Sequence, residues 1–347
     1  MTNSPHLVKF DHQVAGHDQL LQLATNDLIV VKPCTQTEIV FYEASQQYPE
    51  FDEFIPECYG SLRAATESEK HMLEIDAANN NQVNQDGVTS LPLEHLCLEN
   101  ILRGFTRPSI LDLKIGDKLY DDFADEAKRE KMTLNAKNTT IETLALRISG
   151  MKVYDTVERE YKIYRKKYGR MRTNVDVIDA FLAYFFPLSS YGQQSTPDVT
   201  MPDNQKQDGQ HLQGRISSKK MIWILESFID DLNDIQEFVA THPQLELTGS
   251  SLLFVYEGDK ATVDKVWKRM LDEDKGIQLG KMDDEEKEEE EEEEEPPAKM
   301  CDLRLIDFAH SRWNPARSLP DEGVLKGMNN MVGFLRQCLE RLQLENL

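Results

Sequence analysis

PSILDLKIG, residues 108–116, is the stretch that most constrains the fold and the chemistry of this chain. If Pro108 begins a β-strand, alternation places Asp112 and Lys114 on one face and three aliphatic side chains on the other. A carboxylate and an ammonium group on one face of an otherwise apolar strand are costly to bury without partners. The pattern therefore indicates either a structural ion pair at a strand edge or a pair of functional residues.

Apolar periodicity on both sides of this stretch predicts a mixed α and β protein. Strands are expected at residues 27–33, 144–154 (with a glycine interruption), 250–258 and 303–310, and helices at 37–45, 125–132, 174–186, 221–240 and 325–342. The polar stretches 64–90 and 193–215 are interpreted as a surface insertion and a mobile loop. With 347 residues, one large domain or two lobes is the expected organisation.

Composition and charge restrict the class of protein. No uninterrupted apolar run is long enough to cross a bilayer, and the N-terminal residues lack the features of a secretory signal. Five scattered cysteines without a CxxC pair indicate reduced thiols rather than disulfides or a zinc site. The net charge of −23 argues against direct binding to nucleic acid, so a polyanionic ligand would require a local basic patch. We expect a monomer located in the nucleus and cytoplasm.

An acidic tract accounts for part of this charge. Residues 283–295 hold twelve acids and one lysine. Like-charge repulsion keeps such a run extended, so a disordered insertion is predicted at about residues 276–300. The tract is interpreted either as a solvated loop or as a docking segment for a basic protein partner, such as a transcription factor.

Several residues suit phosphoryl transfer. Lys32 ends an apolar strand, and Glu38 follows on an expected helix, as in the lysine–glutamate pair that fixes the phosphate-binding ammonium group of bilobal kinases. The GxGxxG and GxxxxGK[ST] loops are both absent, so the chain is neither a protein kinase nor a P-loop enzyme by motif. Asp307, at the end of an expected strand, is a candidate ligand for Mg²⁺ together with phosphate oxygens.

Two basic segments could bind the phosphates of an acceptor. Lys128 and Lys131 lie one helical turn apart, and Lys137 follows. Residues 161–172, YKIYRKKYGRMR, hold six cations, including Lys166, and no acid. A solvated helix face or a nuclear import signal is the alternative interpretation of the second segment.

These motifs together resemble the inositol polyphosphate kinase family. PSILDLKIG fits its PxxxDxKxG signature, SSLLFVYEG (250–258) its SSLL segment and LIDFAH (305–310) its IDF segment. DKLYDDFADEAKREKM (117–132) is similar to the fungal-type multikinase branch, and AGHD (15–18) and YGR (168–170) also match. The motifs occur in family order and span residues 14–310.

The resemblance implies a bilobal, kinase-like α+β fold with ATP between the lobes. It implies a β-rich N-lobe with the hinge at 1–103, an α/β C-lobe at 104–347 and a helical inositol-binding segment near 117–140. The implied roles are Lys32 on the ATP phosphates, the backbone of Glu99 and Ile101 on the adenine, Asp112 on the ribose, Lys114 between acceptor hydroxyl and transferring phosphate, Asp307 on Mg²⁺, and Lys166 and His310 on the substrate. Asn100 stands where the family usually has aspartate, and Lys131 and Lys166 stand in a region where it usually has glutamines.

The expected activity is ATP- and Mg²⁺-dependent phosphorylation of inositol 1,4,5-trisphosphate and a tetrakisphosphate at the 6- and 3-hydroxyls, towards the pentakisphosphate. One alternative is an inositol hexakisphosphate kinase that makes pyrophosphates. A second alternative, of another class, is an interaction or transcription-regulatory protein that acts through its acidic tract.

Overall fold

The computed structural model describes residues 7–14, 20–24, 26–62, 94–194, 215–274 and 297–345. The expected surface insertion, most of the expected mobile loop, the AGHD segment and the acidic tract 283–295 lie outside the described residues.

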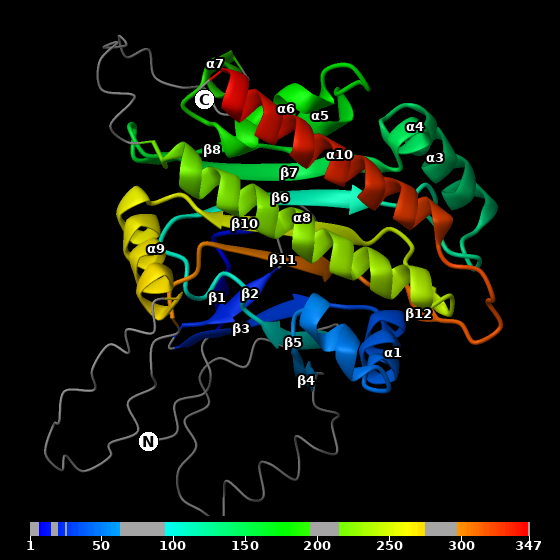
Figure 1. The fold of residues 1–347 in the computed structure, drawn as a ribbon. Coiled ribbons are helices and arrows are strands. Elements are labelled where there is room, and N and C mark those ends of the chain that lie inside the picture. Colours follow the sequence, from blue (N-terminus) through cyan, green and yellow to red (C-terminus); the bar gives the residue numbers. More distant parts are fainter. Residues whose placement is uncertain are drawn as a thin grey trace, which may run out of the picture.

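Two five-stranded antiparallel sheets form the framework of two lobes (Figure 1). The N-lobe sheet has the order β1 (Leu7–Lys9), β2 (Leu21–Leu23), β3 (Asn26–Pro33), β5 (His95–Glu99) and β4 (Cys58–Leu62). The C-lobe sheet has the order β11 (Cys301–Ile306), β10 (Ser251–Glu257), β6 (Pro108–Ile115), β7 (Leu146–Asp155) and β8 (Glu160–Tyr164). A short ribbon pairs β9 (Leu245–Glu246) with β12 (Arg312–Trp313). The expected mixed α and β, two-lobed fold is confirmed.

Helices cover both lobes. They are α1 (Gln36–Ser45), the 3-10 helix η1 (Pro49–Phe54), α3 (Glu126–Lys137), α4 (Ile141–Leu144), α5 (Lys166–Arg170), α6 (Val177–Phe185), α7 (Ser190–Gln194), α8 (Ser218–Thr241), α9 (Lys260–Asp274) and α10 (Glu322–Glu345). The predicted strand at 144–154 starts two residues later, after α4, and is not interrupted at Gly150. Instead, the register between β6 and β7 shifts beside this glycine. None of the helices in the described ranges has the length and apolar character needed to cross a membrane.

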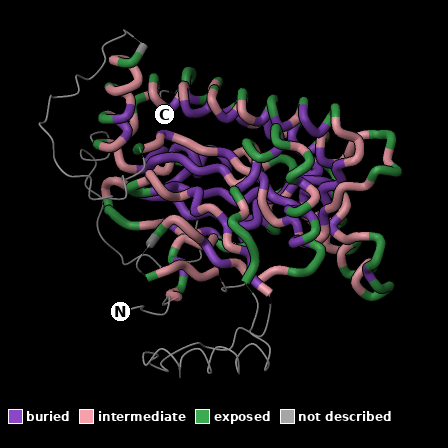
Figure 2. The backbone as a smooth tube through the Cα atoms, turned by 90° about the horizontal axis from the view of Figure 1, so that it is seen from below, coloured by how far each residue is buried: buried purple, intermediate pink, exposed green. Residues whose placement is uncertain are grey.

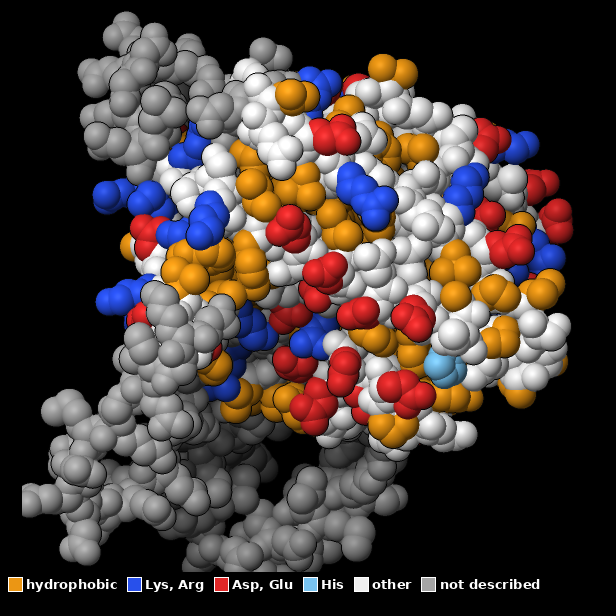
Figure 3. All heavy atoms as spheres, viewed as in Figure 1, with side chains coloured by type: hydrophobic (Ala, Val, Ile, Leu, Met, Phe, Trp, Pro, Cys, Tyr) orange, Lys and Arg blue, Asp and Glu red, His pale blue; other side chains and the backbone are white. Residues whose placement is uncertain are grey.

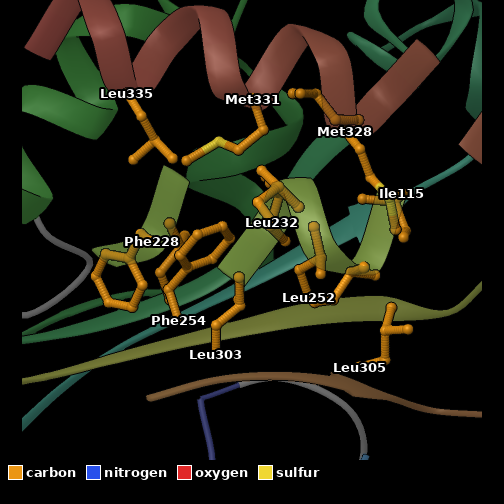
Figure 4. Packing of buried hydrophobic residues seen from close by; sticks show 14 of the residues in the cluster. Ile115, Phe228, Leu232, Leu252, Phe254, Leu303, Leu305, Met328, Met331 and Leu335 are labelled. Carbon is orange, nitrogen blue, oxygen red and sulfur yellow. The ribbon is translucent and has the colours of Figure 1, made fainter. Parts of the chain in front are cut away.

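The main core lies between the C-lobe sheet and the two long helices α8 and α10, which run along the same face (Figures 1 and 4). Phe254 of β10, Phe228 and Leu232 of α8, and Met331 and Leu335 of α10 all have 0% exposure. Burying one such side chain contributes roughly 1.5–3 kcal/mol. Figure 2 shows the buried residues concentrated on the strands and on the inward faces of the helices.

β6 lies at the centre of this sheet, and its two faces have different surroundings. Leu111, Leu113 and Ile115 have 0% exposure and belong to the core cluster. Asp112 and Lys114 alternate with them and line the space on the opposite side, towards the N-lobe. The alternation predicted from PSILDLKIG is therefore confirmed, and it carries a carboxylate and an ammonium group to the boundary between the lobes.

Candidate functional site

A cavity of about 570 Å³ lies between the two sheets, within the size range of small-molecule sites. Val30 of β3 and Leu253 of β10 line it from the two lobes, and residues 99–102 close it at the connection between them. The sequence-predicted residues that line this one cavity are Lys32, Glu99, Ile101, Asp112, Lys114, Asp307 and His310. The sequence also placed Lys128, Lys131, Lys137 and Lys166 at the site, but these four do not line the cavity itself.

Lys32 is held by two carboxylates. Its Nζ lies 2.7 Å from Oε1 of Glu38 and 2.8 Å from Oδ1 of Asp307. Glu38 is in the first turn of α1, where the N-cap Thr35 accepts its backbone N–H, so the cap fixes the start of the helix that carries Glu38. Burial alone would lower the pKa of Lys32, but the carboxylates of Asp307 and Glu38 raise it above the ordinary value. The predicted lysine–glutamate pair is present, and its ammonium group is charged at neutral pH.

Asp307 occupies a strained turn directly after β11. Its φ is 65°, in the left-handed region that non-glycine residues seldom adopt. Phe308 holds the turn, because its N–H donates to Oε1 of Glu38 over 3.1 Å and its ring stacks on Phe41 with centroids 4.3 Å apart. Burial would raise the pKa of Asp307, but Lys32 and Lys114 lower it below the ordinary value. The cavity therefore receives an ionised carboxylate from this turn.

Asp112 and Lys114 lie deeper, on the floor of the cavity. Asp112 is 5% exposed, and its Oδ1 has no hydrogen-bond partner among the described residues. Burial and the charge of Asp307 raise the pKa of Asp112 to about 6, against the opposing effects of Lys114 and of the nearby Ser251 and Ser149 hydroxyl groups. Lys114 donates to the backbone oxygen of Gly249. Burial lowers the pKa of Lys114 despite the charges of Asp307 and Asp112.

The residues present fit a divalent cation that arrives with a phosphate ligand. No group of three or more His, Cys, Asp or Glu side chains that could hold a metal occurs within the described ranges. Mg²⁺, however, usually binds one or two carboxylates together with waters and substrate phosphates. Asp307 provides one ionised carboxylate that lines the cavity, beside the charged ammonium group of Lys32.

The connection between the lobes is shaped by Asn100. Its Nδ2 donates to the backbone oxygen of Asp27 over 2.7 Å, and its Oδ1 accepts the N–H of Leu102 over 3.1 Å. An amide can make both contacts, whereas an ionised carboxylate could only accept. The N–H of Glu99 donates to the backbone oxygen of Glu57, so this N–H is not free for a ligand.

The three lysines predicted on α3 to bind the acceptor lie in different surroundings. α3 begins after Asp125, whose carboxylate accepts the N–H of Lys128, as expected for an N-cap. Nζ of Lys128 lies 3.5 Å from Nε2 of His310, whose Nδ1 pairs with Asp121 at 2.5 Å. Lys131 and Lys137 are exposed on α3. Lys128 and His310 thus form one unit at the edge of the cavity, and the other two lysines are surface residues.

Sequence reasoning missed Arg147, which lies directly opposite Lys114 in the ladder between β6 and β7. It is 4% exposed, and its Nε and Nη1 have no hydrogen-bond partner among the described residues. Burial and the charge of Arg170 lower the pKa of Arg147. Lys166 belongs to the same group, because burial first and then Arg170, Arg147 and Lys114 lower its pKa. These four cations, the basic cluster, repel one another and would be stabilised by a polyanion.

A sequence signal for Arg147 did exist. It is the only charged residue between Leu144 and Met151, in a segment that is otherwise apolar, small or hydroxylated. A guanidinium group at such a position is rarely buried without a partner. That signal becomes specific only once the strand is known to lie beside Lys114.

Comparison with known families agrees with this geometry. The family described as inositol polyphosphate kinase matches residues 95–336. The inositol polyphosphate multikinase of Saccharomyces cerevisiae is 30% identical, and the match covers 93% of this chain and 96% of the yeast protein. The inositol polyphosphate multikinase of Schizosaccharomyces pombe is 25% identical, with 95% of this chain and 97% of that protein covered.

A solved structure gives the same result for the fold. The crystal structure of the inositol phosphate multikinase from S. cerevisiae, in complex with ADP and Mn²⁺, matches with a TM-score of 0.59 and 25% identity. The match covers 90% of this chain and 99% of that chain.

Proposed function

The chain belongs to the inositol polyphosphate kinase family, and on this premise we propose that it phosphorylates inositol 1,4,5-trisphosphate and then a tetrakisphosphate, at the 6- and 3-hydroxyls. The observation that carries this proposal is the basic cluster of Lys114, Arg147, Lys166 and Arg170 next to a nucleotide-sized cavity. The related yeast enzyme was solved with ADP and Mn²⁺, which supports ATP and a divalent ion as co-reactants here.

The nucleotide would lie between the lobes. The backbone of Glu99 and Ile101, which line the cavity, would contact the adenine edge, and the apolar side chains Val30 and Leu253 line the cavity on the two sides. Asp112 would accept ribose hydroxyls, which would satisfy the buried Oδ1 that has no partner in the described protein. Lys32 would bind the phosphates.

The transfer itself needs positioned positive charge more than a strong base. The acceptor hydroxyl oxygen attacks the terminal phosphorus, the bond to the bridging oxygen breaks, ADP leaves, and the hydroxyl proton is released to solvent. Lys114 lines the cavity, feels the charges of Asp112 and Asp307 and lies opposite Arg147 in the sheet, so its ammonium group would contact both the acceptor and the transferring phosphate. We assign Lys114 the catalytic contact.

Asp307 is the residue that would hold Mg²⁺, which supplies neutralisation of the charge on the phosphate oxygens when bound. Lys32 keeps the Asp307 carboxylate ionised and aimed into the cavity. The left-handed turn at Asp307 fixes this direction.

The acceptor would bind on the other side of Lys114. The basic cluster would contact its standing phosphates, and the Lys128–His310 unit would contact it from α3. Charge-assisted contacts of this kind are worth roughly 1.5–3 kcal/mol each. Lys131 and Lys137 would contribute only from the rim of the site.

A substrate panel tests the proposal. The full chain is incubated with ATP, Mg²⁺ and separately with inositol trisphosphate, tetrakisphosphate or hexakisphosphate, and Lys114→Ala serves as the inactive control. We expect the trisphosphate to be converted through a tetrakisphosphate to a pentakisphosphate. Conversion of the hexakisphosphate to a pyrophosphate, with the trisphosphate left intact, would instead establish the hexakisphosphate kinase alternative.

A further inference from the structure

A segment near the N-terminus crosses from the N-lobe to the side of the C-lobe sheet. This segment, residues 10–14, is named the strap. Phe10, His12, Gln13 and Val14 of the strap line the same cavity as Lys32 and Asp112. It follows β1 and lies outside residues 95–336, which match the family. One wall of the candidate nucleotide site is therefore formed by a short segment that must be held in place.

The strap is attached to the C-lobe through Lys152 of β7. Nζ of Lys152 donates to the backbone oxygen of Asp11 over 3.0 Å and lies 3.3 Å from Nδ1 of His12. The same ammonium group is 4.5 Å from the centre of the Tyr161 ring on β8. Lys152 therefore joins a strand of one lobe to the backbone of the other.

His12 adds aromatic contacts to this attachment. Its ring meets Phe10 edge-on, with centroids 6.1 Å apart, and meets Tyr161 edge-on at 6.0 Å. Burial, followed by the charge of Lys152, lowers the pKa of His12 to about 4. The imidazole is neutral at pH 7, so its Nδ1 is able to accept a hydrogen bond from Lys152.

Lys152 has an unusual environment for a buried lysine. Its exposure is 8%, yet it forms no ion pair with a carboxylate in the parts of the chain that the structure describes. Lys162, another buried lysine on the adjacent strand β8, instead forms an ion pair with Asp155 at 2.9 Å. A buried ammonium group is costly without acceptors, so the Asp11 carbonyl and the Tyr161 ring are its essential partners. Lys152 thus favours the conformation in which the strap contacts β7 and β8.

We propose that Lys152 is a positioning residue that fastens the strap across the nucleotide cleft and thereby raises the affinity for ATP. The inference rests on the proposed function for the identity of the nucleotide. Lys152 does not line the cavity, so it acts through Phe10, His12 and Gln13 rather than by touching the ligand. Loss of the contact between Lys152 and the strap should let the strap move away and open one wall of the site.

Nucleotide binding is measured in the full chain with Mg²⁺ by titration calorimetry, which needs no acceptor. Lys152→Met removes the hydrogen bond and keeps the aliphatic stem on Tyr161, and Lys152→Arg keeps a donor and the cation–ring contact. Lys260→Met is the control, because Lys260 pairs with Asp264 on α9 and does not line the cavity. Hydrogen exchange of the amides in residues 9–13 reports on the strap itself.

We expect Lys152→Met to weaken ATP binding about tenfold, the loss of one hydrogen bond to a charged group, and to speed exchange in the strap. Lys152→Arg should restore most of the affinity, and Lys260→Met should not differ from the native chain. In turnover, KM for ATP should rise while kcat and KM for the inositol phosphate stay unchanged. If Lys152→Met does not fold, His12→Ala is expected to give the same weakened binding without a change in buried charge.

Three outcomes separate the possible failures. If a folded Lys152→Met or His12→Ala variant binds ATP as tightly as the native chain, the proposed positioning role of Lys152 is wrong. If Lys152→Met lowers kcat and raises the KM for ATP and the KM for the inositol phosphate alike, and Lys152→Arg restores none of them, then Lys152 has only a structural role. Absence of ATP binding in the native chain would refute the proposed function instead.

Discussion

Asp112 illustrates a residue that destabilises the fold in order to serve a site. The carboxyl group is buried on a central strand, and burial and Asp307 raise its pKa to about 6. A group whose pKa is higher in the folded state binds its proton more tightly there than in the unfolded chain. Ionising it therefore lowers the free energy of unfolding as the pH rises from about 4 to about 6. At neutral pH the native chain carries this loss in full.

Asp112→Asn is expected to raise the free energy of unfolding at pH 7 by about 1–3 kcal/mol, because an upward shift of one pKa unit is worth about 1.4 kcal/mol. Below pH 4 the two proteins should be equally stable. Urea unfolding at pH 4, 5 and 7 measures the difference, and the same variant should bind ATP weakly. A stability difference that is independent of pH would show that the carboxylate is not the strained group.

Arg147 behaves in a similar way, because it would gain partners only from a ligand. Arg147→Met removes a buried guanidinium group with two unsatisfied nitrogens, so the fold should be as stable as before or more stable. KM for the inositol phosphate should rise by about ten- to a hundredfold, the value of one charge-assisted contact, with ATP binding unchanged. Lys167→Met is the control, because Lys167 is an exposed residue of α5 outside the basic cluster. A loss of ATP affinity in Arg147→Met would place the basic cluster on the nucleotide instead.

For single residues, local sequence patterns predicted four residues of the site and missed Arg147, which no such pattern marks. Asp112, Lys114 and Asp307 stand in short signatures, Lys32 ends an apolar strand shortly before Glu38, and the structure brings all four to one cavity. Arg147 comes to Lys114 only through strand pairing across a register shift, which cannot be read from local spacing. Assigning chemical roles to these residues remains a prediction.

At the scale of elements, the connection between the lobes depends on a side chain rather than on backbone pairing alone. Asn100 donates to Asp27 and accepts from Leu102, so its amide ties the connection to the start of β3. Asparagine stands here where the family usually has aspartate. A substitution towards the family pattern is often stabilising, but the two opposite hydrogen bonds predict the reverse in this chain.

Asn100→Asp should lower the free energy of unfolding by about 1–3 kcal/mol, because the carboxylate would face the carbonyl oxygen of Asp27 without a donor. Chemical denaturation at pH 7 measures this. Asn100→Gln is the comparison, because it keeps the donor and the acceptor of the amide on a side chain that is one methylene longer. Unchanged or greater stability in Asn100→Asp would mean that the connection rearranges freely.

Elements were the level at which sequence reasoning was most accurate. Alternation located β6, and an acid before good helix formers located α3, where Asp125 caps the helix. Whole elements were also missed, including α9, β8 and α4, and the single turn of α4 is too short to produce a periodic signal. The helix predicted to begin at Thr37 begins at Gln36 instead. Thr35 is its N-cap, because the Thr35 side chain accepts the backbone N–H of Glu38, three residues later.

At the scale of the whole molecule, the basic cluster must attract a polyanion to a protein whose net charge is −23. Acidic side chains are spread over the face that carries α8 and α10 (Figure 3). The tract 283–295 adds a net charge of −11. In the sequence it lies between strands β10 and β11, and Asp307 directly follows β11. The charge of the tract has the same sign as that of the substrate that the site is proposed to bind, so we expect a repulsion that depends on ionic strength.

Replacing the twelve acids of this tract by glutamine, at unchanged length, should therefore help substrate capture. At low ionic strength we expect KM for inositol trisphosphate to fall by roughly two- to fivefold, while at 0.5 M salt, where the Debye length is only about 4 Å, the difference should vanish. The melting temperature and kcat should stay nearly unchanged, since a run of like charges has little reason to pack. Initial rates across a salt series, compared with a chain that lacks 283–295 altogether, separate charge from length. A drop in melting temperature, or an effect on KM that persists in high salt, would mean that the tract makes specific contacts with the folded protein.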